Sequence, residues 1–160
     1  MSEPTEPRRP PVRQSIVVAA SQARTFAALT GRLVEWWPLD PLSYGGAARV
    51  RTVALDGRVG GEVSEHWRDG TVRSWGTVLV WEPPERLVMT WNVTPAATEV
   101  ELCFRRIDAD TTRVEVEHRG WERLSAEQLT AACAHPGGYA GGAFAQGWSS
   151  VLQALEEYLR

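Results

Sequence analysis

The sequence predicts a single α+β domain in which an antiparallel sheet of about seven strands packs against one long C-terminal helix. Two patterns lead to this prediction. Between residues 48 and 118 apolar residues alternate with polar ones and short turn sequences interrupt the alternation, which is typical of strands joined by hairpins. In residues 140–160 the large apolar residues lie along one face of a helix, and no proline breaks the pattern. Because an amphipathic helix is not stable alone in water, this face must pack on the strands.

The N-terminal part of the chain changes from polar to strand-like. Residues 1–11 hold four prolines among charged side chains, so we expect a disordered leader before a single domain over residues 12–160. A first strand is expected at residues 12–18. Ser21 is a suitable N-cap for a short helix, and a second short helix stops at Pro38, so two short helices should follow strand one.

Six further strands are expected without an intervening helix. Turn sequences such as Asp56-Gly57 and Asp69-Gly70 separate them, as in hairpins. The expected strands are 49–55, 61–67, 72–81, 86–92, 99–107 and 111–118. Because no helical period lies between them, a parallel sheet built from βαβ units is excluded. A short helix is expected over residues 125–134, where Ser125 and Gln128 have the spacing of a capping box.

Alternation along the strands predicts which side chains face the long helix. In strands 99–107 and 111–118 the even-numbered residues are mostly apolar and their neighbours are charged, so the even set points inward. The predicted inward residues are Val100, Leu102, Phe104, Val114, Val116 and His118, together with Leu87, Met89 and Trp91 from strand 86–92. Strand 72–81 has apolar residues on both faces. We favour Gly76, Val78 and Val80 as its inward set over Trp75, Leu79 and Trp81.

Composition narrows the class of function. The chain has 17 basic and 20 acidic residues, and the basic ones are scattered, which argues against a nucleic-acid partner. It has no apolar run long enough to predict a membrane span. Cys103 and Cys133 lack metal-binding or disulfide spacing and are expected as buried thiols of a cytoplasmic protein. Eight tryptophans exceed what such a core requires, which indicates either an aromatic-lined cavity or an adhesive interface.

Few residues could carry catalysis. His118 is expected beside aromatic residues, where its imidazole could bind a ligand or act as a general base; alternatively, nearby backbone satisfies its nitrogens. His66 and His135 do not form metal-ligand spacing with it, and no metal is expected. Glu65 and Arg73 should face each other across one hairpin. A surface ion pair is the preferred interpretation, and a pair of polar groups inside a cavity is the alternative.

Several local motifs, in their order and spacing, make the chain resemble a known family. They are Thr25-Phe26 to Leu29-Thr30, Glu35-Trp36-Trp37-Pro38, Gly60-Gly61, Trp75-Gly76-Thr77-Val78, Glu82-Pro83-Pro84-Glu85-Arg86-Leu87 with Thr90-Trp91, Thr112-Arg113-Val114 through Glu117-His118-Arg119-Gly120-Trp121, and Gly147-Trp148. Over residues 12–160 the chain resembles the helix-grip fold of the START and Bet v 1-like (SRPBCC) superfamily, and within it the proteins similar to the activator of Hsp90 ATPase.

This resemblance implies a curved sheet wrapped around the last helix, with a cavity between them that often takes an apolar or aromatic small molecule. Some relatives are polyketide aromatases or cyclases, some transport lipids, and the eukaryotic namesake binds a chaperone. The fold alone does not choose among these activities.

We therefore expect a cytoplasmic protein that binds a small hydrophobic or aromatic molecule without catalysing a reaction. The residues expected to line its cavity are Trp36, Trp37, Met89, Trp91, His118, Trp121, Phe144 and Trp148. One alternative is an aromatase- or cyclase-like enzyme with His118 as acid or base. Another is an interaction module in which exposed tryptophans bind a chaperone or regulator. No cofactor, metal, nucleic acid or membrane partner is expected.

Overall fold

The computed structural model describes residues 9–94, 96–125, 127–128 and 143–160. Its seven strands form one antiparallel sheet in the order β1-β7-β6-β5-β4-β3-β2. The strands are β1 (Val12–Val18), β2 (Val50–Leu55), β3 (Glu62–Trp67), β4 (Val72–Glu82), β5 (Arg86–Trp91), β6 (Thr98–Asp108) and β7 (Thr111–Arg119). Strands β2 to β7 follow one another along the chain, and β1 pairs with β7, with Val12 opposite His118. The predicted meander is confirmed, and each strand bound lies within one residue of its prediction.

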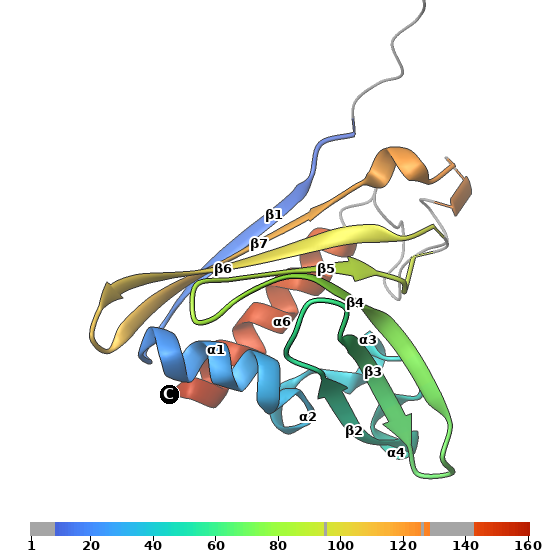
Figure 1. Ribbon diagram of the computed structural model, residues 1–160, viewed down its shortest axis with the longest axis horizontal. Coiled ribbons are helices and arrows are strands. Elements are labelled where there is room, and N and C mark those ends of the chain that lie inside the picture. The colour runs from blue at the N-terminus through green and yellow to red at the C-terminus, as the bar shows by residue number, and fades with distance from the viewer. Residues whose placement is uncertain (1–8, 95, 126, 129–142) are drawn as a thin grey trace, which may run out of the picture.

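The long C-terminal helix α6 (Ala143–Leu159) packs on this sheet, so the predicted α+β helix-grip fold is confirmed. Figure 1 shows α6 running along one side of the curved sheet, with helix α1 (Gln22–Gly31) near its C-terminal end. A hydrogen bond of 3.3 Å from Arg24 to the carbonyl of Leu159 joins these two helices. The side chain of Ser21 caps α1 by accepting the N–H of Arg24, as expected from its position.

The segment between β1 and β2 contains more helical turns than predicted. After α1 come three single-turn helices, α2 (Leu33–Trp36), α3 (Leu39–Leu42) and α4 (Gly46–Arg49), where one further short helix was expected. A 3₁₀ turn, η1 (Trp121–Arg123), follows β7. Most of the helix predicted over residues 125–134 lies outside the described residues. Ser125 and Gln128 do exchange the two hydrogen bonds of the predicted capping box.

One apolar core fills the space between α6 and the sheet. The α6 residues of this core are Trp148, Val151, Leu152, Leu155 and Leu159. Each residue that alternation placed inward on β5, β6 and β7 is buried, His118 included. A smaller cluster of Trp121, Leu124 and Phe144 adjoins the N-terminal end of α6. The parity argument is therefore confirmed for these three strands.

Strand β4 does not keep one parity along its length. Trp75 and Val78 are both buried, although an odd and an even residue of a regular strand face opposite sides. The pairing register shifts between Val63 and Ser64 of β3 and again between Val78 and Val80, so β-bulges reset the alternation. The sequence favoured the even-numbered residues of this strand as the inward set. Val78 is inward as predicted, but Trp75, which was expected to point outward, is also buried. Gly76 lies against the backbone of Thr90 so closely that any side chain there would collide with it.

Two further sequence expectations can be placed on the structure. No helix within the described ranges is long and apolar enough to cross a lipid bilayer. Cys103 is half-buried on β6 rather than buried, and Cys133 lies outside the described residues.

Candidate functional site

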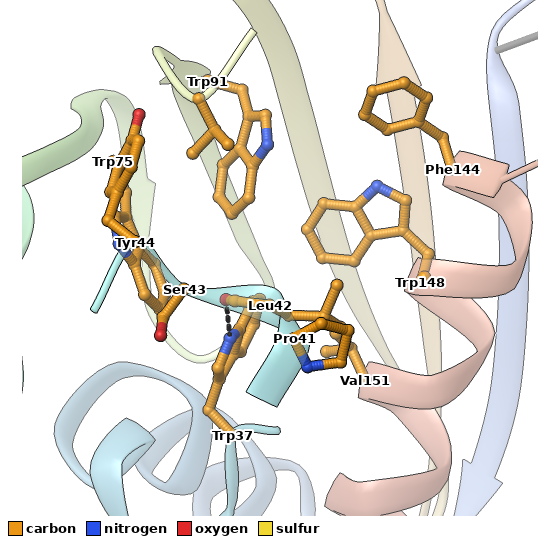
Figure 2. Close-up of a pocket in the computed structure, with 12 residues that line it drawn as sticks. Trp37, Pro41, Leu42, Ser43, Tyr44, Trp75, Trp91, Phe144, Trp148 and Val151 are labelled. Carbon is orange, nitrogen blue, oxygen red and sulfur yellow. Dashed lines mark hydrogen bonds between the residues drawn. The ribbon is translucent and has the colours of Figure 1, made fainter. Parts of the chain in front are cut away.

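A cavity of about 150 Å³ lies between α6, the segment of residues 37–44, and strands β4 and β5 with the residues that follow β5. Its lining consists of Trp37, Pro41, Leu42, Ser43, Tyr44, Trp75, Trp91, Val93, Phe144, Gly147, Trp148 and Val151. Figure 2 shows Tyr44 and Trp75 on one side of this space and Phe144 and Trp148 on the opposite side. None of the lining residues has a charged side chain, so the cavity suits an uncharged, largely apolar molecule.

Four tryptophans of the cavity lining form one cluster of ring contacts, in which Trp37 also lies 6.3 Å from Trp91, so the four indoles pack together and form part of the cavity wall. The centroid distances are 4.9 Å for Trp37 and Trp75, 6.0 Å for Trp75 and Trp91, 5.3 Å for Trp91 and Trp148, and 6.2 Å for Trp148 and Trp37. All four pairs are tilted or edge-on, the geometries that aromatic quadrupoles favour. The indoles come from three distant parts of the chain and meet only through the fold.

Hydrogen bonds fix the orientation of three of these indoles. The Trp37 N–H donates to the carbonyl of Leu42 at 2.8 Å, which also holds the segment before α4 against the cavity. The Trp75 N–H donates to the carboxylate of Glu65 at 2.7 Å. The Trp148 N–H donates to Nδ1 of His118 at 3.0 Å. The cavity walls are thus held in place by buried polar contacts as well as by packing.

Glu65 on β3 is the buried anion that supports one side of the cavity. Its side chain is fully buried, and it accepts four N–H groups at 2.7–2.9 Å, from the indoles of Trp67 and Trp75 and the backbone of Tyr44 and Gly45. Burial by itself raises the pKa of this carboxyl, but the four donors outweigh burial and the net pKa lies below the usual value. Glu65 therefore stays ionised at neutral pH and positions both Trp75 and the Tyr44 loop.

The predicted surface ion pair between Glu65 and Arg73 is wrong. The two residues do lie opposite each other in the β3–β4 ladder. However, Glu65 points into the protein, whereas the Arg73 guanidinium lies over the ring of Tyr44 at 4.7 Å from its centroid. The physical reason is that the indole and backbone donors around Glu65 compensate its burial, which a single exposed arginine could not do.

His118 lies behind the cavity wall rather than on it. An indole N–H can only donate, so Nδ1 of His118 must accept from Trp148, and Nε2 then carries the proton and donates to Oγ1 of Thr98 at 2.7 Å. Burial lowers the pKa of His118 to about 3, so the ring is neutral at physiological pH. Both nitrogens are satisfied by side chains, not by the backbone near Arg119 as the alternative interpretation had it.

The structure brings together half of the residues predicted to line a cavity. Trp37, Trp91, Phe144 and Trp148 do line it. Trp36 is buried beside Trp37 with its N–H on the carbonyl of Ala28, and Met89 is buried in the core. His118 and Trp121 form a second layer behind Trp148 and Phe144, at ring distances of 5.9 Å for His118–Trp148 and 4.5 Å for Trp121–Phe144. A role in ligand binding stays a prediction for all eight.

The main lining residues that the sequence did not indicate are Trp75 and the Ser43-Tyr44 segment. Trp75 was missed because the bulges in β4 interrupt the alternation from which the direction of its side chain was predicted. Tyr44 was missed because its position depends on Glu65, which is remote in the sequence. The tryptophan count was the one usable signal for this site.

Comparison with known proteins identifies the family. The model of the Activator of Hsp90 ATPase homolog 1-like protein family matches residues 19–160. The chain belongs to this family. The predicted resemblance to proteins similar to the activator of Hsp90 ATPase is thereby confirmed. No curated protein matches the chain.

Several solved structures are similar to this chain. A Nitrosomonas europaea protein is 19% identical with a TM-score of 0.65, and the match covers 94% of each chain. The Aha1 dimer from Colwellia psychrerythraea is 16% identical with a TM-score of 0.63 over 93% of this chain and 95% of that one. At such identity these two comparisons support the fold alone. The anthrahydroquino-gamma-pyrone synthase Txn09 is 28% identical with a TM-score of 0.55 over 95% and 96% of the two chains.

Proposed function

We propose that the protein binds a small hydrophobic or aromatic molecule in the tryptophan-lined cavity and does not transform it. The observation that carries this proposal is the cluster of Trp37, Trp75, Trp91 and Trp148 in the lining of an uncharged cavity. Indoles held edge-on and tilted offer an inserted planar molecule several aromatic surfaces, and each good aromatic contact contributes about 0.5–1.5 kcal/mol beyond area burial. Because hydrogen bonds already fix three of the rings, little side-chain entropy is lost on binding.

The position of His118 favours binding over catalysis. Its two nitrogens are occupied by Trp148 and Thr98, and its pKa of about 3 leaves the ring neutral. A general base needs a free lone pair within reach of the substrate, and here the Trp148 indole takes that lone pair. The hydroxyl of Ser43 is likewise engaged, because it donates to the carbonyl of Leu39 at 2.7 Å.

The burial of the tryptophans favours a cavity over a tryptophan-mediated docking surface. All eight tryptophans are buried or half-buried. Hot spots of protein interfaces require aromatic side chains that a partner can cover, and the tryptophans here are already covered by their own chain. Binding of a chaperone or regulator through exposed tryptophans therefore has less support than ligand binding.

Titration of intrinsic fluorescence tests the proposal. Aromatic ligands that enter the cavity should change tryptophan emission saturably. A ligand at a hundred times its dissociation constant should also stabilise the domain by about 2.7 kcal/mol, seen as a raised melting temperature. A broad panel of bicyclic and tricyclic aromatic compounds and fatty acids that gives neither effect would contradict the proposal.

A pair of variants shows whether any binding occurs in this cavity. Val93 lines the cavity and is partly exposed, so Val93→Trp should fill part of it and weaken binding at least about tenfold, or about 1.4 kcal/mol. Val72 is exposed on β4 and does not line the cavity, so Val72→Trp is the matched control and should leave affinity unchanged. Equal effects of the two variants would place the binding site elsewhere.

A cyclase activity is the second candidate, and the observation that favours it is the 28% identity to the anthrahydroquino-gamma-pyrone synthase. A cyclase of this kind needs orientation of a flexible substrate and one acid or base. Tyr44 is the candidate hydroxyl for that task, since it lines the cavity, is partly exposed and makes only a long hydrogen bond of 3.5 Å to the carbonyl of Asn92. If the protein turns over a linear aromatic polyketide precursor, and Tyr44→Phe lowers this turnover about a hundredfold, the enzyme hypothesis is supported.

A further inference from the structure

The cavity contains one polar group whose hydrogen-bonding capacity the described protein does not use. Trp37, Trp75 and Trp148 each donate their indole N–H to a protein acceptor. For the Trp91 N–H, the described part of the chain supplies no acceptor. Trp91 is 8% exposed and lines the cavity, so a molecule in the cavity is the partner left for this N–H. Buried donors in proteins are almost always paired, and an unpaired one in a cavity points to a ligand.

The Trp91 indole is held with this donor facing the site. The carbonyl of Trp91 accepts the hydroxyl of Thr94 at 2.9 Å, which fixes the end of β5. Its ring packs between Trp75 and Trp148 at 6.0 and 5.3 Å. Figure 2 shows the nitrogen edge of the ring turned toward the side of Trp148 and Phe144, which line the same cavity. The donor is therefore oriented before any ligand arrives.

The same lining selects against charged ligands. It has no cationic side chain to pair with a carboxylate, and an unpaired anion would lose its hydration on entry. A neutral carbonyl oxygen loses far less hydration free energy on entry, and a single N–H donor is enough to satisfy it. The remaining lining is aromatic and aliphatic, which suits a planar ring system of one or two rings in a cavity of about 150 Å³.

We infer that Trp91 donates its indole N–H to the carbonyl oxygen of a neutral aromatic ketone, and that this contact selects such ketones over aromatic hydrocarbons and aromatic carboxylates. This inference rests on the proposed binding function and specifies its ligand class. It makes Trp91 the specificity-determining residue and the other three indoles the shape-determining ones.

Three bicyclic probes of nearly equal shape test the inference on the full chain. They are 1-tetralone, tetralin and 1,2,3,4-tetrahydro-1-naphthoate, with dissociation constants measured by calorimetry. The variant Trp91→Phe keeps an aromatic ring and removes the N–H. It should weaken 1-tetralone about three- to tenfold more than it weakens tetralin, the size expected for one net hydrogen bond. In the unaltered protein the carboxylate should bind at least about tenfold more weakly than 1-tetralone.

Trp37→Phe is the matched control, because the Trp37 N–H already has a partner in the protein. It should weaken 1-tetralone and tetralin by the same factor. If Trp91→Phe does not fold, the inference can be tested by NMR on the ¹⁵N-labelled unaltered protein, through the N–H proton resonance of the Trp91 indole. It should shift downfield with 1-tetralone and not with tetralin.

The outcomes separate the inference from the proposed function. If both uncharged probes bind and Trp91→Phe weakens them equally, the cavity still binds ligands and the hydrogen bond is refuted. Tighter binding of the carboxylate than of 1-tetralone also overturns the inference. If neither uncharged probe binds while other ligands of the broad panel do bind, only the ketone preference fails. If nothing in the panel binds, the proposed function fails and the inference fails with it.

Discussion

The indole N–H of Trp148 donates to Nδ1 of His118 over 3.0 Å, and this bond joins the cavity wall on α6 to the interior of strand β7. It continues as a chain of polar contacts. Nε2 of His118 lies 2.7 Å from Oγ1 of Thr98, which lies 3.1 Å from Oγ1 of Thr94. Each member is buried and each has a partner, so the chain is a stable polar core element rather than a reactive site.

Protonation of His118 should destabilise the domain in mildly acidic solution. The pKa of His118 is about 3 in the folded protein and 6.5 ordinarily. Between these values His118 is protonated in the unfolded chain and neutral in the folded one. Stability linked to this group is complete above pH 6.5 and falls by about 1.4 kcal/mol per pH unit as the pH drops toward 3. Urea unfolding between pH 7 and pH 4 measures this slope.

His118→Gln isolates this contribution, because glutamine does not titrate in that range and carries both an acceptor and a donor. The difference in unfolding free energy between the two proteins should shrink as the pH falls below 6.5. A difference that is constant from pH 7 to pH 4 would show that His118 is not buried in its neutral form.

Glu65→Gln should destabilise the fold by about 3 kcal/mol or more. Each carboxylate oxygen accepts two N–H groups, so the NH₂ of glutamine would face two donors in either orientation. Ligand binding should weaken as well, since Tyr44 and Trp75 both lose their anchor. Urea unfolding at pH 7 gives the free energy, and near-ultraviolet circular dichroism reports the tryptophan environment.

Glu62 on the same strand provides the control. It is exposed and accepts the hydroxyls of Ser74 and Thr77. Glu62→Gln should change stability by no more than about 0.5 kcal/mol, as surface substitutions usually do. A comparable loss in both variants would mean that the effect at Glu65 is not due to its buried donors.

Substitutions of Trp148 should separate its packing from its hydrogen bond. Trp148→Ala removes a side chain that is 5% exposed and should cost about 3–5 kcal/mol. Trp148→Phe keeps most of the packing but leaves Nδ1 of His118 without a donor, which should cost about 1–3 kcal/mol. A much smaller loss for alanine would mean that Trp148 mainly borders open space in the cavity.

Two N-terminal truncations should behave differently. Arg9 donates to the carbonyls of Trp121 and Leu124, the first at 2.9 Å, although it falls within the predicted leader. Deleting residues 1–8 should leave the melting temperature unchanged. Deleting residues 1–11 should lower it by about 2–4 °C, the shift that a loss of about 1 kcal/mol produces in a domain of this size. Arg9→Ala in the full chain should reproduce most of this drop, and an unchanged value would assign it to Pro10 or Pro11 instead.

The sheet could be predicted from the sequence because its determinants are local. Charged and apolar residues alternate strictly at Glu99, Val100, Glu101 and Leu102, and this fixes both the strand and its inward face. The direction of Trp75 could not be predicted in this way. The bulges that turn it inward depend on the partner strand, which sequence alternation does not report.

For the site, the sequence could predict the kind of side chain in its lining but not the arrangement of these side chains. An excess of tryptophan indicated an aromatic cavity, and Trp37, Trp91 and Trp148 do line it. An interior Glu65 was only the alternative to a surface pair, and its donors could not be predicted, since they come from the Tyr44 loop, its own strand and β4, which only the folded chain brings together. Buried charge of this kind contradicts local hydropathy, which is why it escapes pattern-based reasoning.

The position of α6 in the chain affects how the protein is made. Strand β1 is synthesised before the other strands, yet its partners are β7, the last strand, and α6, which follows all of the strands. Until then α1 and α2 cover only part of the apolar face of the nascent sheet, and contacts between such distant segments form slowly. Completion of the fold therefore falls after translation of α6, and the chain is most exposed to aggregation while the nascent sheet is only partly covered.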